Sequence, residues 1–337
     1  MSNDKTAGDT DVLLRPIVTN YLESIKPELL GAAQSAVAHV AAQLIDGITP
    51  HKVQVRINDT VVATLPRQHF LFEPVLKLLA AKDRYGQPLN IALFGPTGSG
   101  KTKMCIFAAK ALGIELVLQP FNPHTTKSEL LGYMDASGKY VPSPFYLAFT
   151  KGLLFIADEF DAANPAIATC LNASVGNRMV TFPNGETAQA HQNFRAIFCM
   201  NTDGRGGDDQ YTGRNRLDMA TLDRLVYVHV PLDEGLEAHL VGVNRSSPSA
   251  NIEEGGQFKD NEEIFEHVTT FRKAMADNKL RYFLSPRATM NACAMHEAGF
   301  GKVWIDNCCI WRGIPQHVRK QVYDSLGGAN PAATVAA

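Results

Sequence analysis

The chain has 337 residues, of which 45% are hydrophobic and 20% are charged, and this balance is typical of a folded globular protein. Its formal net charge of −2 excludes an overall basic field that would attract nucleic acid or an anionic membrane. No apolar run is long enough to cross a bilayer, and the polar start does not resemble a secretory signal.

The six cysteines do not form a disulfide framework in a chain of this length. Cys105, Cys170 and Cys199 lie in apolar contexts, which predicts small buried thiols. Adjacent Cys308 and Cys309 lack the spacing of a zinc site. Together these patterns predict a reducing, cytoplasmic compartment.

Residues 1–85 predict an N-terminal extension made of helices and a β-hairpin. Apolar residues recur at helical spacing over 14–25 and 30–44, after a start that is expected to be disordered. These helices could pack on the following domain or form a subunit contact, and both alternatives stay open. Alternating patterns over 52–57 and 60–65 flank a turn, which predicts the hairpin.

A helix is expected over 67–81, in which Pro74 either introduces a kink or marks the true start. Strands and helices then alternate over 86–231, as in a parallel sheet covered by helices on both faces. Over 232–327 the pattern is all-helical, which indicates a domain boundary near 231, and 328–337 should be a disordered tail. The expected strands are 90–94, 114–118, 153–156, 195–200 and 225–230, and the later helices lie near 233–243, 260–277, 285–298 and 314–326.

A glycine-rich loop follows the first of these strands and leads into a helix over 103–112. It matches the pattern Gly, four residues, Gly-Lys-Thr in the strand–loop–helix context that a phosphate loop requires, which disfavours a chance glycine turn. Its backbone amides and the dipole of the following helix can bind phosphates. The lysine can neutralise the charge of the phosphates, and the threonine hydroxyl can bind Mg²⁺. The loop residues are Gly95, Pro96, Thr97, Gly98, Ser99, Gly100, Lys101 and Thr102.

Polar residues end the third and fourth expected strands, and parallel strands deliver ligands from their carboxyl ends. Asp158 is placed to hold Mg²⁺ through water, and Glu159 to polarise an attacking water as a general base. A solvated acidic turn is the alternative. Asn201 could orient that water with its amide, or it could cap the next turn.

These motifs occur in the order seen in AAA+ ATPases. The chain looks most like the MoxR-type branch, which includes cobaltochelatase ATPase subunits, the ATPases that activate rubisco or nitric oxide reductase, and the midasin and dynein modules. Segments 131–140 and 180–194 resemble inserts of that branch, and 208–224 resembles phage- and plasmid-borne relatives in particular. The motifs that carry the resemblance are 95–102, Asp158-Glu159, Asn201, Leu222-Asp223-Arg224 and Ser285-Pro286-Arg287.

The resemblance implies an α/β P-loop AAA+ module with a parallel sheet, followed by a small all-α lid, and ATP with Mg²⁺ as cofactors. Asn201 would be sensor 1, and Arg287 would be sensor 2, contacting the phosphates within its own subunit. Arg224 would be the arginine finger that reaches the γ-phosphate of a neighbouring subunit. Arg214 and Arg216 lie close by in the sequence, so the identity of the finger stays open.

The resemblance also implies an ATP-hydrolysing remodelling motor or chaperone that forms a ring, expected to be a hexamer, and acts on a protein partner. Relatives often work with a partner that bears a von Willebrand factor A domain. One alternative is a nucleic-acid motor or helicase loader, which the near-neutral charge disfavours. Another is an ATP-gated scaffold without significant hydrolysis, which the intact acidic pair disfavours.

Two further expectations concern aromatic residues. Tyr140, with the loop tip at 183–185, would face a ring pore or a partner, or Tyr140 would pack against its own hairpin. Trp304 and Trp311, with Ile305 and Ile310, are expected in the core of the lid, in preference to a binding stripe.

Overall fold

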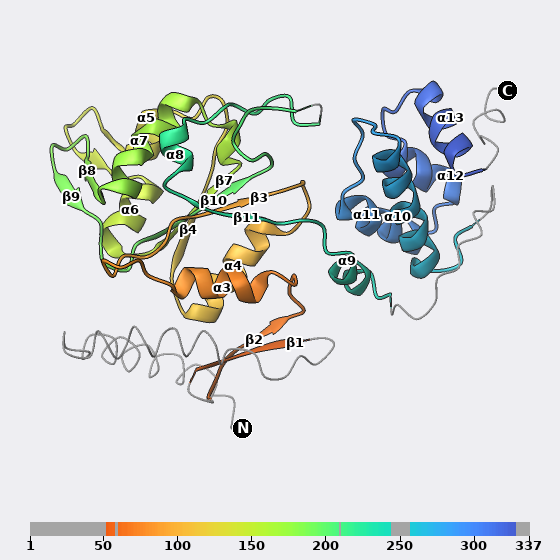
Figure 1. Ribbon diagram of the computed structural model, residues 1–337, viewed down its shortest axis with the longest axis horizontal. Helices are drawn as coiled ribbons and strands as arrows, with labels where there is room; N and C mark the ends of the chain where they lie inside the picture. Colours follow the sequence, from red (N-terminus) through yellow and green to blue (C-terminus); the bar gives the residue numbers. More distant parts are fainter. Residues whose placement is uncertain (1–51, 58–59, 209, 244–256, 328–337) are drawn as a thin grey trace, which may run out of the picture.

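A computed structural model describes residues 52–57, 60–208, 210–243 and 257–327 (Figure 1). The helices expected over 14–25 and 30–44 and the tail over 328–337 lie outside the described residues. No helix among the described residues is long and apolar enough to span a membrane.

A parallel five-stranded sheet forms the centre of the α/β part, with the strand order β11-β3-β10-β7-β4. This order places β10 between β3 and β7, so the carboxyl ends of these three strands are neighbours. Whatever follows them in the sequence must therefore meet at one edge of the sheet. The strands are β3 (Ile91–Phe94), β4 (Leu116–Pro120), β7 (Leu154–Asp158), β10 (Arg195–Met200) and β11 (Val226–His229).

Helices cover both faces of the sheet (Figure 1). Successive residues of a strand point to opposite faces, so alternate residues join different clusters. Leu154 and Ile156 of β7 pack with α3 (Phe72–Ala80) and α4 (Lys101–Leu112). Phe155 and Ala157 of β7 pack on the other face. The helices of that face are α5 (Lys127–Leu131), α6 (Pro144–Lys151) and α7 (Pro165–Gly176), with the short α8 (Met219–Leu222) beside them.

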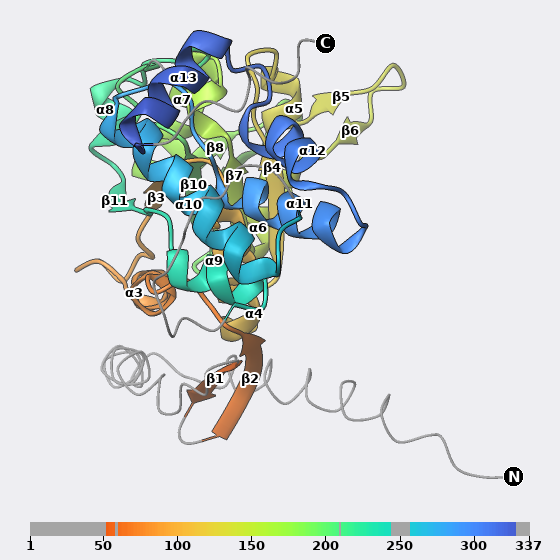
Figure 2. The same ribbon diagram turned by 90° about the vertical axis from the view of Figure 1, so that its right-hand side faces the viewer.

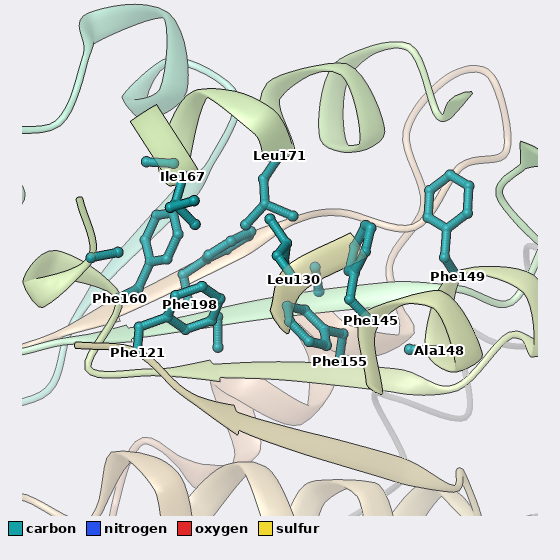
Figure 3. Packing of buried hydrophobic residues seen from close by; sticks show 14 of the residues in the cluster. Phe121, Leu130, Phe145, Ala148, Phe149, Phe155, Phe160, Ile167, Leu171 and Phe198 are labelled. Carbon is teal, nitrogen blue, oxygen red and sulfur yellow. The ribbon is translucent and has the colours of Figure 1, made fainter. Parts of the chain in front are cut away.

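Aromatic side chains dominate this second face (Figure 3). Phe145 lies edge-on to Phe155 with ring centroids 5.2 Å apart, and Phe160 lies 4.6 Å from Phe198. Such rings bury large apolar areas and stabilise the sheet–helix interface. Phe160 directly follows the acidic pair, so this core fixes the backbone on which the pair stands.

Three short antiparallel hairpins among the described residues are separate from the central sheet. Tyr140 donates a hydrogen bond from its hydroxyl to the carbonyl of Leu131 at 2.6 Å and packs edge-on against Tyr146. This contact favours the alternative in which Tyr140 packs against its own hairpin. The paired strands are β1 (Lys52–Ile57) with β2 (Thr60–Pro66), β5 (Tyr133–Met134) with β6 (Tyr140–Val141), and β8 (Met179–Thr181) with β9 (Thr187–Gln189).

The β1–β2 hairpin lies beside α3 and α4 in both views (Figures 1 and 2). Its Val55 and Leu65 belong to the same buried cluster as those helices. The hairpin predicted from alternation is confirmed, with a register shift between Val55 and Arg56.

The helices after β11 form a group with its own apolar cluster, drawn apart from the sheet in Figure 1. Trp311 is buried against Phe271, but Trp304 is 64% exposed, so the expectation that Trp304 lies in this core is wrong. Ile305 takes the buried position instead, and the neighbouring tryptophan falls on the outer side of the turn. The elements are α9 (Glu234–Leu240), α10 (Asn261–Asp277), α11 (Pro286–Glu297), α12 (Lys302–Ile305), the π-helical η3 (Asp306–Ile310) and α13 (Gln316–Ser325).

Element bounds differ from the sequence expectation in a few places. Helix α3 begins at Phe72, five residues later than expected, and Pro74 lies within its first turn, where a missing amide is tolerated. Strand β4 is shifted by two residues toward the C-terminus. Cys105 and Cys199 are buried as predicted, whereas Cys170 is only half-buried.

A buried ion pair joins three helices of the C-terminal group. Arg272 of α10 forms two hydrogen bonds to the carboxylate of Glu237 in α9, at 2.7 and 2.8 Å. Thr289 of α11 donates to the same carboxylate. This network fixes the first turn of α11, which carries Arg287.

Arg272→Met is expected to lower the free energy of unfolding by about 3–5 kcal/mol, because it leaves the buried Glu237 carboxylate without its partner. Chemical denaturation of the full chain measures this change. Lys273→Met, at an exposed position of the same helix, is the matched control and should change stability by less than about 0.5 kcal/mol. Equal effects of the two substitutions would contradict a structural role for the pair.

Candidate active site

The loop between β3 and α4 is shaped by glycines in backbone conformations that other residues rarely adopt. Gly100 caps α4 with φ 88°, and Gly98 has φ 81°. A Cβ atom on Gly95 would lie 2.3 Å from the carbonyl oxygen of Val230, so only glycine fits at this position. The turn presents the first amides of α4 at the carboxyl edge of the sheet, where the helix dipole favours an anion.

Lys101 is buried in this loop. Its Nζ donates hydrogen bonds to the carbonyl oxygens of Gly95 at 2.7 Å and Pro96 at 2.9 Å. Burial lowers the pKa of Lys101, while the carboxylates of Asp158 and Glu159 are among the groups that oppose this shift. The ammonium group is thus poorly hydrated, and an anion in the loop would gain a strong electrostatic partner.

The acidic pair at the end of β7 faces the loop. The hydroxyl of Thr102 donates to both carboxylate oxygens of Asp158, at 3.0 and 3.1 Å. Glu159 has φ 57°, in the left-handed region, where a residue with a side chain costs of order 1–3 kcal/mol. Strained backbone of this kind is concentrated at functional sites, and here it sets the direction of the glutamate side chain.

Asn201 follows β10 and lies between the loop and the acidic pair, as the strand order requires. Its side-chain amide donates to Oε2 of Glu159 at 3.2 Å. The backbone amide of Asn201 and that of Thr202 both donate to Oδ2 of Asp161, at 3.0 and 2.8 Å. Asp161 is fully buried, so it fixes the end of β10 and thereby the amide of Asn201.

Residues of α11 and of the segment after β10 contact the same loop residue, Thr97. Arg287, at the start of α11, donates from Nη1 to the hydroxyl of Thr97 at 3.2 Å. The backbone amide of Thr97 donates to the hydroxyl of Tyr211 at 2.9 Å. A Cβ atom on Gly98 would lie 3.0 Å from that of Ser285, so α11 approaches the loop backbone closely.

The three candidate finger arginines lie in different surroundings. Arg214 is paired within the chain with Glu159 and Asp161. Arg224 is exposed; it donates to the carbonyl of Ala220 and lies against Gly176. Within the described part of the chain, Arg224 makes no hydrogen bond to the phosphate-loop residues. Arg216 is exposed and bridges Arg205 through the backbone.

The structure thus brings together six of the predicted site residues and leaves Arg224 away from them, and the six are Lys101, Thr102, Asp158, Glu159, Asn201 and Arg287. No role was predicted for Asp161, which lies two residues after Glu159, or for Tyr211, which lies in the segment 208–224. The signal for Asp161 was an acidic residue three positions beyond Asp158, in an apolar context that predicts burial. Nothing local in the sequence indicates the contact of Tyr211 with Thr97.

Residues 90–225 match the family model described as AAA domain (dynein-related subfamily). The α/β part has the AAA+ fold. The match begins at the residue before β3 and ends just after Arg224, so it contains the phosphate loop, the acidic pair and Asn201. It supports an AAA+ ATPase, and the strand order β11-β3-β10-β7-β4 accounts for why these residues stand at one edge of the sheet.

Curated proteins similar to this chain include proteins of Staphylococcus aureus. An uncharacterized protein of strain USA300 is 28% identical over 165 residues, which is 46% of this chain and 60% of that protein. An uncharacterized protein of the bovine strain RF122 is 27% identical over 165 residues, again 46% of this chain and 60% of that protein. The matched region thus spans less than two thirds of these curated relatives.

A solved structure, titled a closed-state cryo-EM reconstruction of Hsp104 with ATPγS and FITC casein, is 15% identical with a TM-score of 0.43. The alignment covers 67% of this chain and 45% of that chain.

Proposed function

We propose that the carboxyl edge of the sheet binds ATP and hydrolyses it to ADP and phosphate. The observation that carries this proposal is that the glycine loop, the acidic pair and the amide of Asn201 meet at three neighbouring strand ends. Their contacts are those of Thr102 with Asp158 and of Asn201 with Glu159. The AAA domain match over residues 90–225 supports it.

The phosphates of ATP would lie in the glycine loop. Gly98 and Gly100 turn the backbone so that the amides at the start of α4 point into one concavity. Lys101 would exchange its carbonyl partners for phosphate oxygens, since its pKa is already lowered by burial and a phosphate restores a charge partner. Arg287 reaches Thr97 and would add positive charge from the same chain.

The residues present fit Mg²⁺. A hydroxyl and a carboxylate are the hard oxygen donors that this ion prefers, and Thr102 and Asp158 are already within 3.1 Å of each other. When bound with ATP, Mg²⁺ neutralises charge that develops on the phosphate oxygens. Thr102 would bind the ion directly, and Asp158 would hold it through water.

Glu159 would accept the proton of the attacking water. Asn201 fixes the carboxylate by its bond to Oε2 and is itself fixed through Asp161, so two shells of contacts position the base. Positioning of this kind supplies much of the rate enhancement in phosphoryl transfer, because little covalent chemistry is left to the protein.

The site would be completed by a neighbouring subunit. Arg224 is exposed, and its hydrogen bond goes to Ala220 and not to the phosphate loop of its own chain. This placement suits a side chain that acts on the γ-phosphate bound by another copy. A finger of this kind makes hydrolysis depend on assembly, so ATP turnover could drive motion between subunits. We therefore propose a ring, with the hexamer as the leading candidate.

The branch and the target of the motor are also proposals. The segments over 131–140, 180–194 and 208–224 support a MoxR-type remodelling ATPase that acts on a protein partner. A partner with a von Willebrand factor A domain is the first to test, by co-purification with a chain held in its ATP-bound form.

Lys101→Ala tests the proposed ATP site. Loss of the ammonium group should weaken ATP binding at least about 100-fold, because a buried charge-assisted contact to phosphate is lost. Binding of a fluorescent ATP analogue to the full chain and phosphate release in Mg²⁺ both measure this.

Lys110→Ala is the matched control, because Lys110 lies on the exposed face of the same helix. It should leave binding and turnover unchanged. Equal ATP affinity of the Lys101→Ala chain and the wild-type chain would contradict the proposal.

A further inference from the structure

Arg214 makes contacts that differ from those expected of a finger directed at another subunit. Its Nη2 pairs with Oε2 of Glu159, and its Nη1 lies 3.5 Å from Oδ1 of Asp161. The Arg214 side chain is only 15% exposed. The guanidinium is thus directed at two carboxylates of its own chain.

The segment that carries Arg214 is anchored on both sides of the arginine. The backbone amide of Asn215 donates to the carbonyl of Asp161 at 2.8 Å, and its side chain donates to the carbonyl of Ala163 at 3.1 Å. Before the arginine, the hydroxyl oxygen of Tyr211 accepts a hydrogen bond from the backbone amide of Thr97 in the phosphate loop. Burial raises the pKa of Tyr211 above its ordinary value.

Release of Arg214 toward a neighbouring subunit would be unfavourable. Asp161 is fully buried, and Arg214 is the cation next to its Oδ1. Removing one partner of a buried ion pair is strongly destabilising. Among the described residues Arg224 has no comparable restraint, because the hydrogen bond that it donates goes to the backbone carbonyl of Ala220 at the surface.

We propose that Arg214 is a positioning residue that acts in cis, and that it holds the carboxylate of Glu159 in the orientation needed for hydrolysis. It shares Oε2 with Asn201, so two donors from different elements fix one oxygen of the base. Asp161 lies beside both donors. Its Oδ2 accepts a hydrogen bond from the backbone of Asn201, whereas its Oδ1 accepts none from the described residues and lies 3.5 Å from Nη1 of Arg214 as an ion pair. This inference rests on the proposed function.

Arg214→Ala should lower kcat for ATP on the order of 100-fold, as a misplaced catalytic group does, with the KM for ATP within about threefold of wild type. Arg214→Lys should restore part of kcat, because it keeps one charge near Glu159. Arg205→Ala is the control, since Arg205 lies in the same segment in an exposed pair with Asp203.

Mixing variants separates a cis role from a trans role. When Arg214→Ala subunits are mixed with Glu159→Gln subunits, a trans finger would produce sites with both groups intact and turnover would recover. A cis residue leaves every site with one of the two defects, so no recovery is expected at any ratio. Recovery would overturn the inference. Arg214→Lys replaces Arg214→Ala in the mixture if the alanine variant does not fold.

Single-turnover hydrolysis gives a second answer that needs no mixing. If Arg214 acts through Glu159, adding Arg214→Ala to Glu159→Gln should slow hydrolysis no further. A further loss by the factor seen in the single variant would overturn the inference. Absence of ATP turnover by the wild-type chain would overturn the proposed function and this inference together. If the wild-type chain does turn over ATP, recovery in the mixtures or additive losses in the double variant would overturn only the inference.

Discussion

Glu159→Gln is expected to leave ATP binding unchanged and to lower turnover at least about 100-fold. Glutamine has the shape of glutamate and keeps an oxygen for the amide of Asn201, but it cannot accept the proton of water. The left-handed backbone at residue 159 is unaffected by the substitution, so the loop and Lys101 should remain in place. Equilibrium binding of ATP and steady-state phosphate release, measured on the same preparation, test the two halves of this expectation.

Glu115→Gln is the matched control, because Glu115 is exposed and the bond that it makes to Leu154 is through its backbone carbonyl. It should hydrolyse ATP at the wild-type rate. If Glu159→Gln also hydrolysed ATP at that rate, Glu159 would not be the general base, and another acceptor would have to be sought near Asn201.

Arg224→Ala is expected to lower turnover on the order of 10³–10⁵-fold, the range for an arginine that stabilises charge on a transferred phosphoryl group. ATP binding should change little, because Arg224 lies on the surface near Ala220 and Gly176 and not in the phosphate loop of its own chain. Phosphate release and ATP affinity, measured at a fixed subunit concentration, test this expectation.

Mixing assigns the action of Arg224 to the neighbouring subunit. Arg224→Ala subunits mixed with Glu159→Gln subunits should regain part of the turnover, since some interfaces then combine an intact base with an intact finger. Size-exclusion chromatography must show that both variants assemble as the wild type does. Absence of recovery in assembled mixtures would count against Arg224 and would direct attention to Arg216.

Much of the fold could be predicted because it depends on local patterns. The apolar strands at 91–94 and 195–200 were placed closely, since a buried parallel strand is a short apolar run with clear boundaries. The start of α3 and the shift of β4 could not be placed as well, because propensity is nearly flat there and tertiary contacts decide the ends. Trp304 was misplaced since burial in a short helix depends on which neighbours cover it, and spacing alone does not show that.

The candidate site could be predicted where a motif carries its own chemistry. Lys101 and Thr102 stand in a strand–loop–helix context, and the acidic pair stands at the end of an apolar strand. Both contexts are visible in the sequence. The contacts of Arg214 with Glu159 and of Tyr211 with Thr97 span 55 and 114 residues. Contacts at such separations follow from the strand order, which places β10 between β3 and β7, and periodicity does not reveal that order.

The most direct test of the central claim is the rate of phosphate release per chain in Mg²⁺ and saturating ATP, measured over a wide range of protein concentration. If one chain supplies the loop and the base while its neighbour supplies Arg224, turnover per chain should rise steeply as subunits assemble and then level off, and Lys101→Ala should abolish it. Turnover per chain that is constant from the monomer upward, or no turnover at any concentration, would contradict a hydrolysis site completed by a second subunit.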